Sequence, residues 1–156
     1  MKKSYIVYAV LTVGLFALGV VFAKSTIMIM IDIPSLMLVL APVILMLLSH
    51  YGPKEFVNAF RAAMEKSNSN EHELKNALVF FSTAQKLVIA STAATVFLGI
   101  IMILNSIGEG YTDSGKTVAW WMAVDVIAIL YAGLLTMVIT IPFKSALQKR
   151  LNDLKG

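Results

Sequence analysis

Apolar residues along this chain form four long runs, with polar residues gathered between them. Crossing the roughly 30 Å hydrocarbon core of a bilayer takes about 20 apolar residues in a helix. The pattern therefore predicts an all-α membrane protein, a single domain over residues 1–156, with four transmembrane helices at about residues 5–23, 34–49, 87–104 and 118–143.

The second apolar run begins at Ile27 but contains Asp32 and Pro34 near its start. Proline is tolerated in a first helical turn, so the spanning part is expected to begin near Pro34. Asp32 then precedes the helix, where an anion favours the N-terminus. We expect Asp32 to cap this helix at the outer interface.

The segment 50–86 is expected to lie in the cytoplasm and to begin with a short amphipathic helix after Pro53. Asn70 and Glu73 have the spacing of a capping box, which starts a new helix. No helix breaker follows before Gly108, so a helix from 71 to 104 would be about 50 Å long. The third and fourth helices should thus extend into the cytoplasm, the fourth with a kink near Pro142.

Composition supports the membrane interpretation and excludes several other classes. The chain is 58% apolar with a mean hydropathy of +0.80, against roughly 45–50% apolar residues in soluble domains. It has no cysteine, which rules out disulfides and thiolate sites. The two histidines, His50 and His72, are far apart in sequence and no catalytic motif is present. We therefore expect no enzyme activity, cofactor or metal.

The basic residues fix the expected orientation. The ends of the chain and the segment 50–86 carry eleven of the 13 lysines and arginines, and the two opposite loops carry only Lys24 and Lys116. By the positive-inside rule both termini lie in the cytoplasm. The net charge of +4 follows this topology, and no nucleic-acid partner is expected.

The first apolar run has a rival interpretation. Lys2 and Lys3, the apolar residues and the small residue Ala23 also resemble a signal peptide with its cleavage site. The run is longer than the usual 7–15 residues of a signal peptide. A retained first helix is the favoured interpretation.

Asp125 is the one ionisable residue well inside a predicted span. Charges there are costly and usually functional, so proton handling or partner binding is one hypothesis. The alternative is that Asp125 reaches water near the outer surface, or pairs with Lys116 or Lys24. Both interpretations stay open from the sequence.

A face of smaller and more polar residues follows Asp125 along the fourth helix. It comprises Ile129, Ala132, Thr136 and Thr140, and the third helix supplies Ser91, Thr92 and Thr95. These residues would line an ion pathway. Hydroxyls in membrane helices also bond to carbonyls of their own helix, so packing alone is the alternative for each.

Two stretches carry a family resemblance. IDIPSLMLVLAPVILMLLS followed by PKEFVNAFRAAM resembles the second helix and following segment of the flagellar stator protein MotA, and MAVDVIAILYAGLLTMVITIPF is similar to the fourth helix of that family. The resemblance extends to the wider MotA/TolQ/ExbB proton-channel group. It implies a location in a bacterial inner membrane and a homopentamer around a single-span partner of the MotB, ExbD or TolR type.

The resemblance implies that Thr92, Thr95, Ala132, Gly133 and Thr136 face the partner helices, with Asp125 near the outer mouth. Arg61, Glu65 and Lys66 become possible contacts with a rotor or envelope complex. The sequence departs from the family where a threonine is expected, at Ile129 or Leu130, and in its shorter cytoplasmic segment.

The sequence therefore predicts an ion-conducting stator subunit, with the proton as the expected ion, that converts ion-motive force into mechanical work. A small proton-coupled secondary transporter is the alternative, and a non-conducting membrane scaffold is a third possibility.

Overall fold

The computed structural model describes residues 4–22, 24, 28, 31–64, 69–109 and 114–154. The regular structure in these residues is helical throughout. The elements in chain order are α1 (Ser4–Phe22), α2 (Ile33–Ala63), α3 (Glu71–Gly108), α4 (Ser114–Leu135), η2 (Thr136–Thr140) and α5 (Ile141–Asp153).

Four helices in this structure are long and apolar enough to cross a membrane: α1, α2, α3 and the continuous rod formed by α4, η2 and α5. The predicted all-α fold with four candidate spans is thereby confirmed, and the chain is a membrane protein. The last residue of the first predicted span, Ala23, lies outside the described residues.

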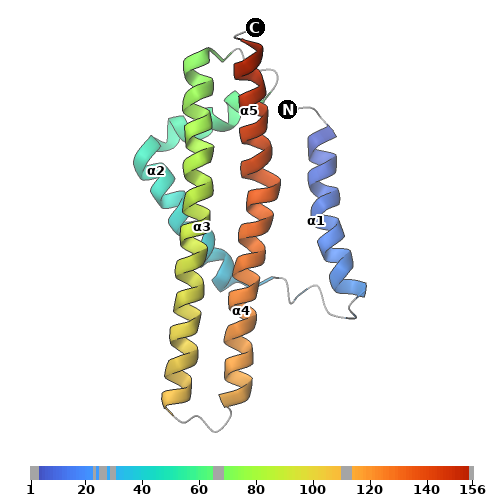
Figure 1. Cartoon of the computed structure of the whole chain (residues 1–156), viewed down its shortest axis with the longest axis vertical. Helices are drawn as coiled ribbons and strands as arrows, with labels where there is room; N and C mark the ends of the chain where they lie inside the picture. The colour runs from blue at the N-terminus through green and yellow to red at the C-terminus, as the bar shows by residue number, and fades with distance from the viewer. Residues whose placement is uncertain are drawn as a thin grey trace.

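The third and fourth spans form a long antiparallel hairpin (Figure 1). With 38 residues, α3 is about 57 Å long, and the 39 residues of Gly115–Asp153 reach about 58 Å. Both lengths exceed the roughly 30 Å core of a bilayer. The hairpin therefore projects well beyond the hydrocarbon, while α2 leans across it and α1 stands to one side (Figure 1).

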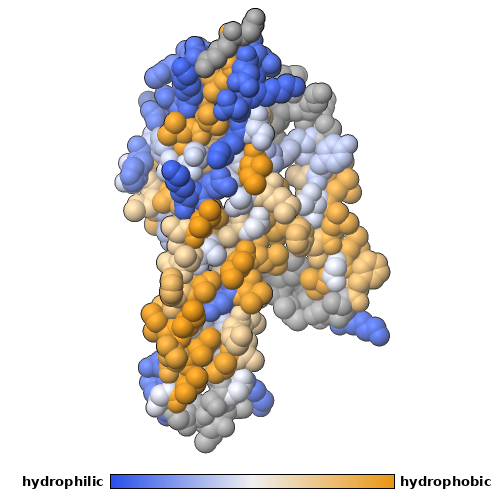
Figure 2. Space-filling model, in the orientation of Figure 1, coloured by the Kyte–Doolittle hydropathy of each residue, from blue (hydrophilic) through white to orange (hydrophobic). Residues whose placement is uncertain are grey.

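Hydrophilic and hydrophobic surfaces separate along the hairpin (Figure 2). One end, which we call the charged end, consists of residues 53–63, 71–86 and 141–154. The other end, the apolar end, consists of residues 87–108 and 114–135. Large apolar side chains there are exposed, among them Phe97 and Ile101 on α3 and Trp120 and Val126 on α4. Such a band fits contact with lipid.

The tightest core lies at the charged end. Phe80, Phe81, Leu74 and Leu147 are almost fully buried there, and the Phe81 and Phe143 rings stack with their centroids 5.0 Å apart. Burial of apolar surface is favourable in water, whereas lipid tails are themselves apolar. A part of the hairpin that faces water needs such a core, and a part that faces lipid does not.

The short helix predicted after Pro53 is confirmed: α2 consists of two helical segments that meet across a kink at Gly52, and the second segment ends at Ala63. The helix is broken locally at Gly52, whose φ of 70° and ψ of 165° lie in a region essentially restricted to glycine. The predicted start of α3 is confirmed: Asn70 accepts from the Glu73 amide at 2.9 Å, and Glu73 accepts from the Asn70 amide at 3.1 Å.

Candidate functional site

Two contacts fix the register of α3 against the α4–α5 rod. The Asp125 carboxylate meets Gly99 at the apolar end, and Phe143 stacks on Phe81 at the charged end. The two contacts are separated by the same number of residues along α3 and along the α4–α5 rod. The helices therefore stay in register over this whole length, and they form a continuous seam.

Asp125 is buried in this seam at the apolar end. Its side chain is only 8% exposed, and its Oδ1 atom has no hydrogen-bond partner among the described residues. Buried polar groups are normally hydrogen-bonded, because removing them from water is costly, above all for a charge. The exception at Asp125 marks it as the strongest candidate for a functional residue.

The surroundings of Asp125 bear on the ion-pairing alternative that the sequence left open. Lys24 and Lys116 are both exposed, and neither reaches the unpartnered Oδ1 atom. The side chain also has little access to water from within a single copy of the chain. Among the described residues none pairs with the Oδ1 atom of Asp125, so neither lysine forms an ion pair there.

Gly99 is what allows the carboxylate to enter the seam. A Cβ atom built on Gly99 would overlap the carboxylate of Asp125. Only a residue without a side chain leaves room at this point of α3. The group that approaches α3 at this point is therefore the carboxylate of Asp125.

Three threonines border the same seam and are buried: Thr92 and Thr95 on α3, and Thr140 in η2. Each hydroxyl donates to a carbonyl of its own helix, Thr92 to Val88 at 2.8 Å and Thr95 to Ser91 at 2.9 Å. Thr140 donates to Thr136 at 3.1 Å. Each hydroxyl proton thus forms a hydrogen bond within its own helix, as expected if these threonines serve only in packing. Each hydroxyl oxygen can still accept a further hydrogen bond.

The other predicted members of the polar face are less enclosed. Ala132 and Thr136 are half-buried, and Ala132 packs against the core. Gly133 and Ile129 are exposed, with open space around Gly133. The expected face is therefore divided, with Asp125 and Thr140 inside the hairpin seam and Gly133 on its outer surface.

The first turn of α2 holds α4 on both sides of Asp125. Ser35, fully buried, donates its hydroxyl to the Val124 carbonyl at 3.3 Å, and the Asp32 backbone amide donates to the Tyr131 hydroxyl at 2.7 Å. Asp32 is also the N-cap of α2, where its Oδ2 accepts from the Ser35 amide at 2.9 Å. The IDIPS segment thus ties α2 to the backbone beside the buried carboxylate.

The sequence did not assign these roles to Ser35 and Tyr131. The only signal was a hydroxyl at each position, and hydroxyls are common in membrane helices. Their pairing depends on how α2 is placed against α4, which periodicity does not specify.

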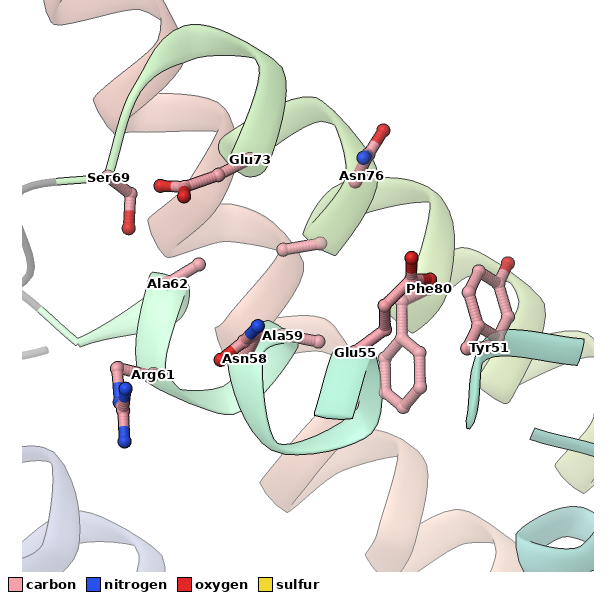
Figure 3. Close-up of a pocket in the computed structure, with 11 residues that line it drawn as sticks. Tyr51, Glu55, Asn58, Ala59, Arg61, Ala62, Ser69, Glu73, Asn76 and Phe80 are labelled. Carbon is pink, nitrogen blue, oxygen red and sulfur yellow. The ribbon is translucent and has the colours of Figure 1, made fainter. Parts of the chain in front are cut away.

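A hollow of about 310 Å³ lies at the charged end, between the last turns of α2 and the first turns of α3 (Figure 3). Glu55, Asn58, Glu73 and Asn76 are among its polar lining residues. Arg61 is exposed at its rim, and its side chain points away from α3 (Figure 3). The other predicted rotor contacts, Glu65 and Lys66, lie outside the described residues.

Within the part of the chain that the structure describes, no group of three or more histidine, cysteine, aspartate or glutamate side chains is placed to hold a metal ion. The seam at Asp125 offers one carboxylate, backbone and hydroxyl oxygens. Such a site can hold and release a proton, or bind a helix that brings its own polar group.

Comparison with known proteins finds no match, whether to a protein-family model, to a curated protein sequence or to a solved structure. Any function has to be argued from the geometry of the chain itself.

Proposed function

We propose that this chain is an ion-conducting subunit of a membrane motor of the MotA/TolQ/ExbB type, with the proton as the ion. Several copies, five by analogy with that group, would surround a single-span partner helix. The observation that carries the proposal is the burial of Asp125 within a candidate span, with its Oδ1 atom unpartnered among the described residues. Ionisable groups inside membrane spans usually belong to ion pathways or to contacts with partner helices.

The shape of the hairpin supports a mechanical role. Asp125 lies at the apolar end of a rod that continues through η2 and α5 into the charged end. A change in the packing around Asp125 can be carried along this rod, because α3 and α5 share the aromatic core. Binding or release of an ion at Asp125 would thereby be linked to the surface of the charged end.

In the proposed orientation, the charged end and both termini face the cytoplasm of a bacterium, and the protein resides in the inner membrane. The exposed surface near Arg61 is then the candidate contact for a rotor or envelope complex. The exposed side of the hairpin at Gly133 is the candidate contact for the partner or a neighbouring copy.

Proton flux into proteoliposomes tests the proposal. The purified chain is reconstituted alone and together with a candidate single-span partner that carries a membrane aspartate, and flux is followed with an enclosed pH-sensitive dye. We expect flux only with the partner, and at least a tenfold reduction in Asp125→Asn, which removes the charge at nearly constant volume. Asp153→Asn, the same change at an exposed position of α5, is the matched control.

Other outcomes favour the alternatives. Flux without a partner that depends on an added substrate would favour a proton-coupled transporter, which uses a midplane ionisable group. A stable complex with the partner that conducts nothing, and in which Asp125→Asn has no effect, would favour a scaffold. Failure to form any oligomer with or without the partner would contradict a stator ring.

A further inference from the structure

The first helix contacts the α4–α5 rod through Tyr5. None of the residues in the apolar window of α1 is buried. At its start, however, Tyr5 packs edge-on against Phe143, with the ring centroids 5.9 Å apart, and the Tyr5 hydroxyl donates to the backbone carbonyl of Val138. Val138 lies in η2 and Phe143 lies in α5, so the contact spans the junction at the start of α5.

The helical hydrogen-bond pattern changes at this junction. Residues Thr136–Thr140 form a π-helical turn, and the Ile141 amide reaches back five residues to the Thr136 carbonyl. In the α-helical pattern that resumes at Ile141, the Val138 carbonyl would pair with the amide of residue 142. That residue is Pro142, which has no amide hydrogen.

The Tyr5 hydroxyl therefore supplies the donor that Pro142 lacks. A carbonyl without a donor is costly within a membrane, because no water is available to replace the bond. Single π-helical turns are rare and occur often at functional positions. A junction with fewer backbone hydrogen bonds than a regular helix can bend more easily. Here the Tyr5 hydroxyl of α1 supplies one hydrogen bond to this junction.

We propose that α1 braces the junction at η2 through Tyr5, and that displacement of α1 frees α5 to change its angle relative to α4. The proposal does not depend on ion conduction, because it concerns only the direction of α5. On the opposite side, α5 remains attached to α3 by the Phe81–Phe143 stack and by the Lys144–Gln85 hydrogen bond of 2.9 Å. A movement at the junction would therefore be transmitted to the charged end.

A simpler role for Tyr5 is that of an interfacial aromatic anchor, which holds α1 at the membrane surface. The two roles differ in which part of the side chain matters. An anchor needs an aromatic ring, whereas the brace needs the hydroxyl. Tyr5→Phe keeps the ring and removes the hydroxyl, so it separates them.

The chain has no cysteine, so spin labels can be placed without removing native residues. Met122→Cys on α4 and Lys149→Cys on α5 are both exposed, and they lie about 40 Å apart along the rod. Pulsed electron resonance in lipid nanodiscs then measures the distance across the junction. We expect one narrow distribution for the labelled parent and a broadened distribution, or one shifted by several ångströms, after Tyr5→Phe.

Two further variants decide the interpretation. Tyr8→Phe removes a hydroxyl from an exposed position of the same helix, 66% exposed, and should leave the distribution unchanged. Pro142→Ala added to Tyr5→Phe restores an amide at residue 142 and should narrow the distribution again. An unchanged distribution after Tyr5→Phe, equal broadening after Tyr8→Phe, or no recovery with Pro142→Ala would each overturn the brace.

Discussion

The carboxylate of Asp125 lies against the backbone of Gly99, in the space that a Cβ atom on Gly99 would occupy. The pair explains how an ionisable group fits between two helices at the apolar end of the hairpin. It also makes Gly99 and Asp125 energetically dependent on each other. Substitutions at the two positions should therefore not have additive effects.

Gly99→Ala is expected to lower the thermal unfolding temperature in detergent. Alanine normally stabilises a helix interior by about 1 kcal/mol over glycine, but here the added methyl group meets the carboxylate, and overpacking costs about 1–3 kcal/mol. Adding Asp125→Ala should restore most of the loss because it removes the colliding group. The control is Gly108→Ala on the same helix, where nothing lies within 4 Å; a loss there equal to that at Gly99 would contradict the steric explanation.

Asp32→Ala is expected to destabilise the start of α2. Loss of an N-cap typically costs about 1 kcal/mol, and Asp32 accepts from the Ser35 amide in this position. Asparagine caps helices about as well as aspartate, so Asp32→Asn should retain most of the stability. Chemical denaturation in mixed micelles measures both variants. Equal losses in the two would mean that the charge of Asp32, and not its capping bond, stabilises the protein.

Gly52→Ala tests the break inside α2. The backbone angles at Gly52 would cost a residue with a Cβ about 1–3 kcal/mol. We expect a lower unfolding temperature and faster amide exchange in residues 53–63, which follow the break. Gly14→Ala in α1 has open space around it and normal helical geometry, so it should be neutral or slightly stabilising. Tolerance of alanine at both positions would show that the chain does not need the break.

Arg150→Met is expected to loosen the last turn of α2. The Arg150 guanidinium donates to the carbonyls of Ala62 and, at 2.8 Å, Met64, where a helix end leaves carbonyls without backbone partners. Hydrogen exchange should become faster in residues 59–64, while α3 from Phe80 onward stays protected. Lys149→Met removes a neighbouring charge at an exposed position. It should leave exchange unchanged, and a similar effect of both variants would indicate a general effect of charge.

Several local features were predictable from the sequence because each depends on a few neighbouring residues. The capping box at Asn70 and Glu73 needs only two side chains three residues apart. The cap at Asp32 follows from an acid placed before a proline and an apolar run. The fourth helix was expected to kink near Pro142, because proline lacks an amide hydrogen, and the structure has a π-helical turn directly before it. The π-helical form of that change was not specified by the residues alone.

The candidate site was only half predictable. An isolated aspartate in an apolar run identifies Asp125 from the sequence, since lipid makes such a residue costly. Its neighbours are not readable in the same way. Gly99, Ser35 and Tyr131 lie far from Asp125 along the chain, and they meet it or its helix only through the packing of α2 and α3 against α4.

The sequence by itself determined that the chain forms four apolar helices, two of them longer than a bilayer is thick. Hydrophobicity and helix length act within a segment, so they can be read residue by residue. Only the tertiary structure decided that Asp125 rests on Gly99 and that Tyr5 completes the junction before Pro142. Those contacts depend on the rotation and register of whole helices, and many arrangements of apolar helices in lipid bury similar surface until such polar contacts select one.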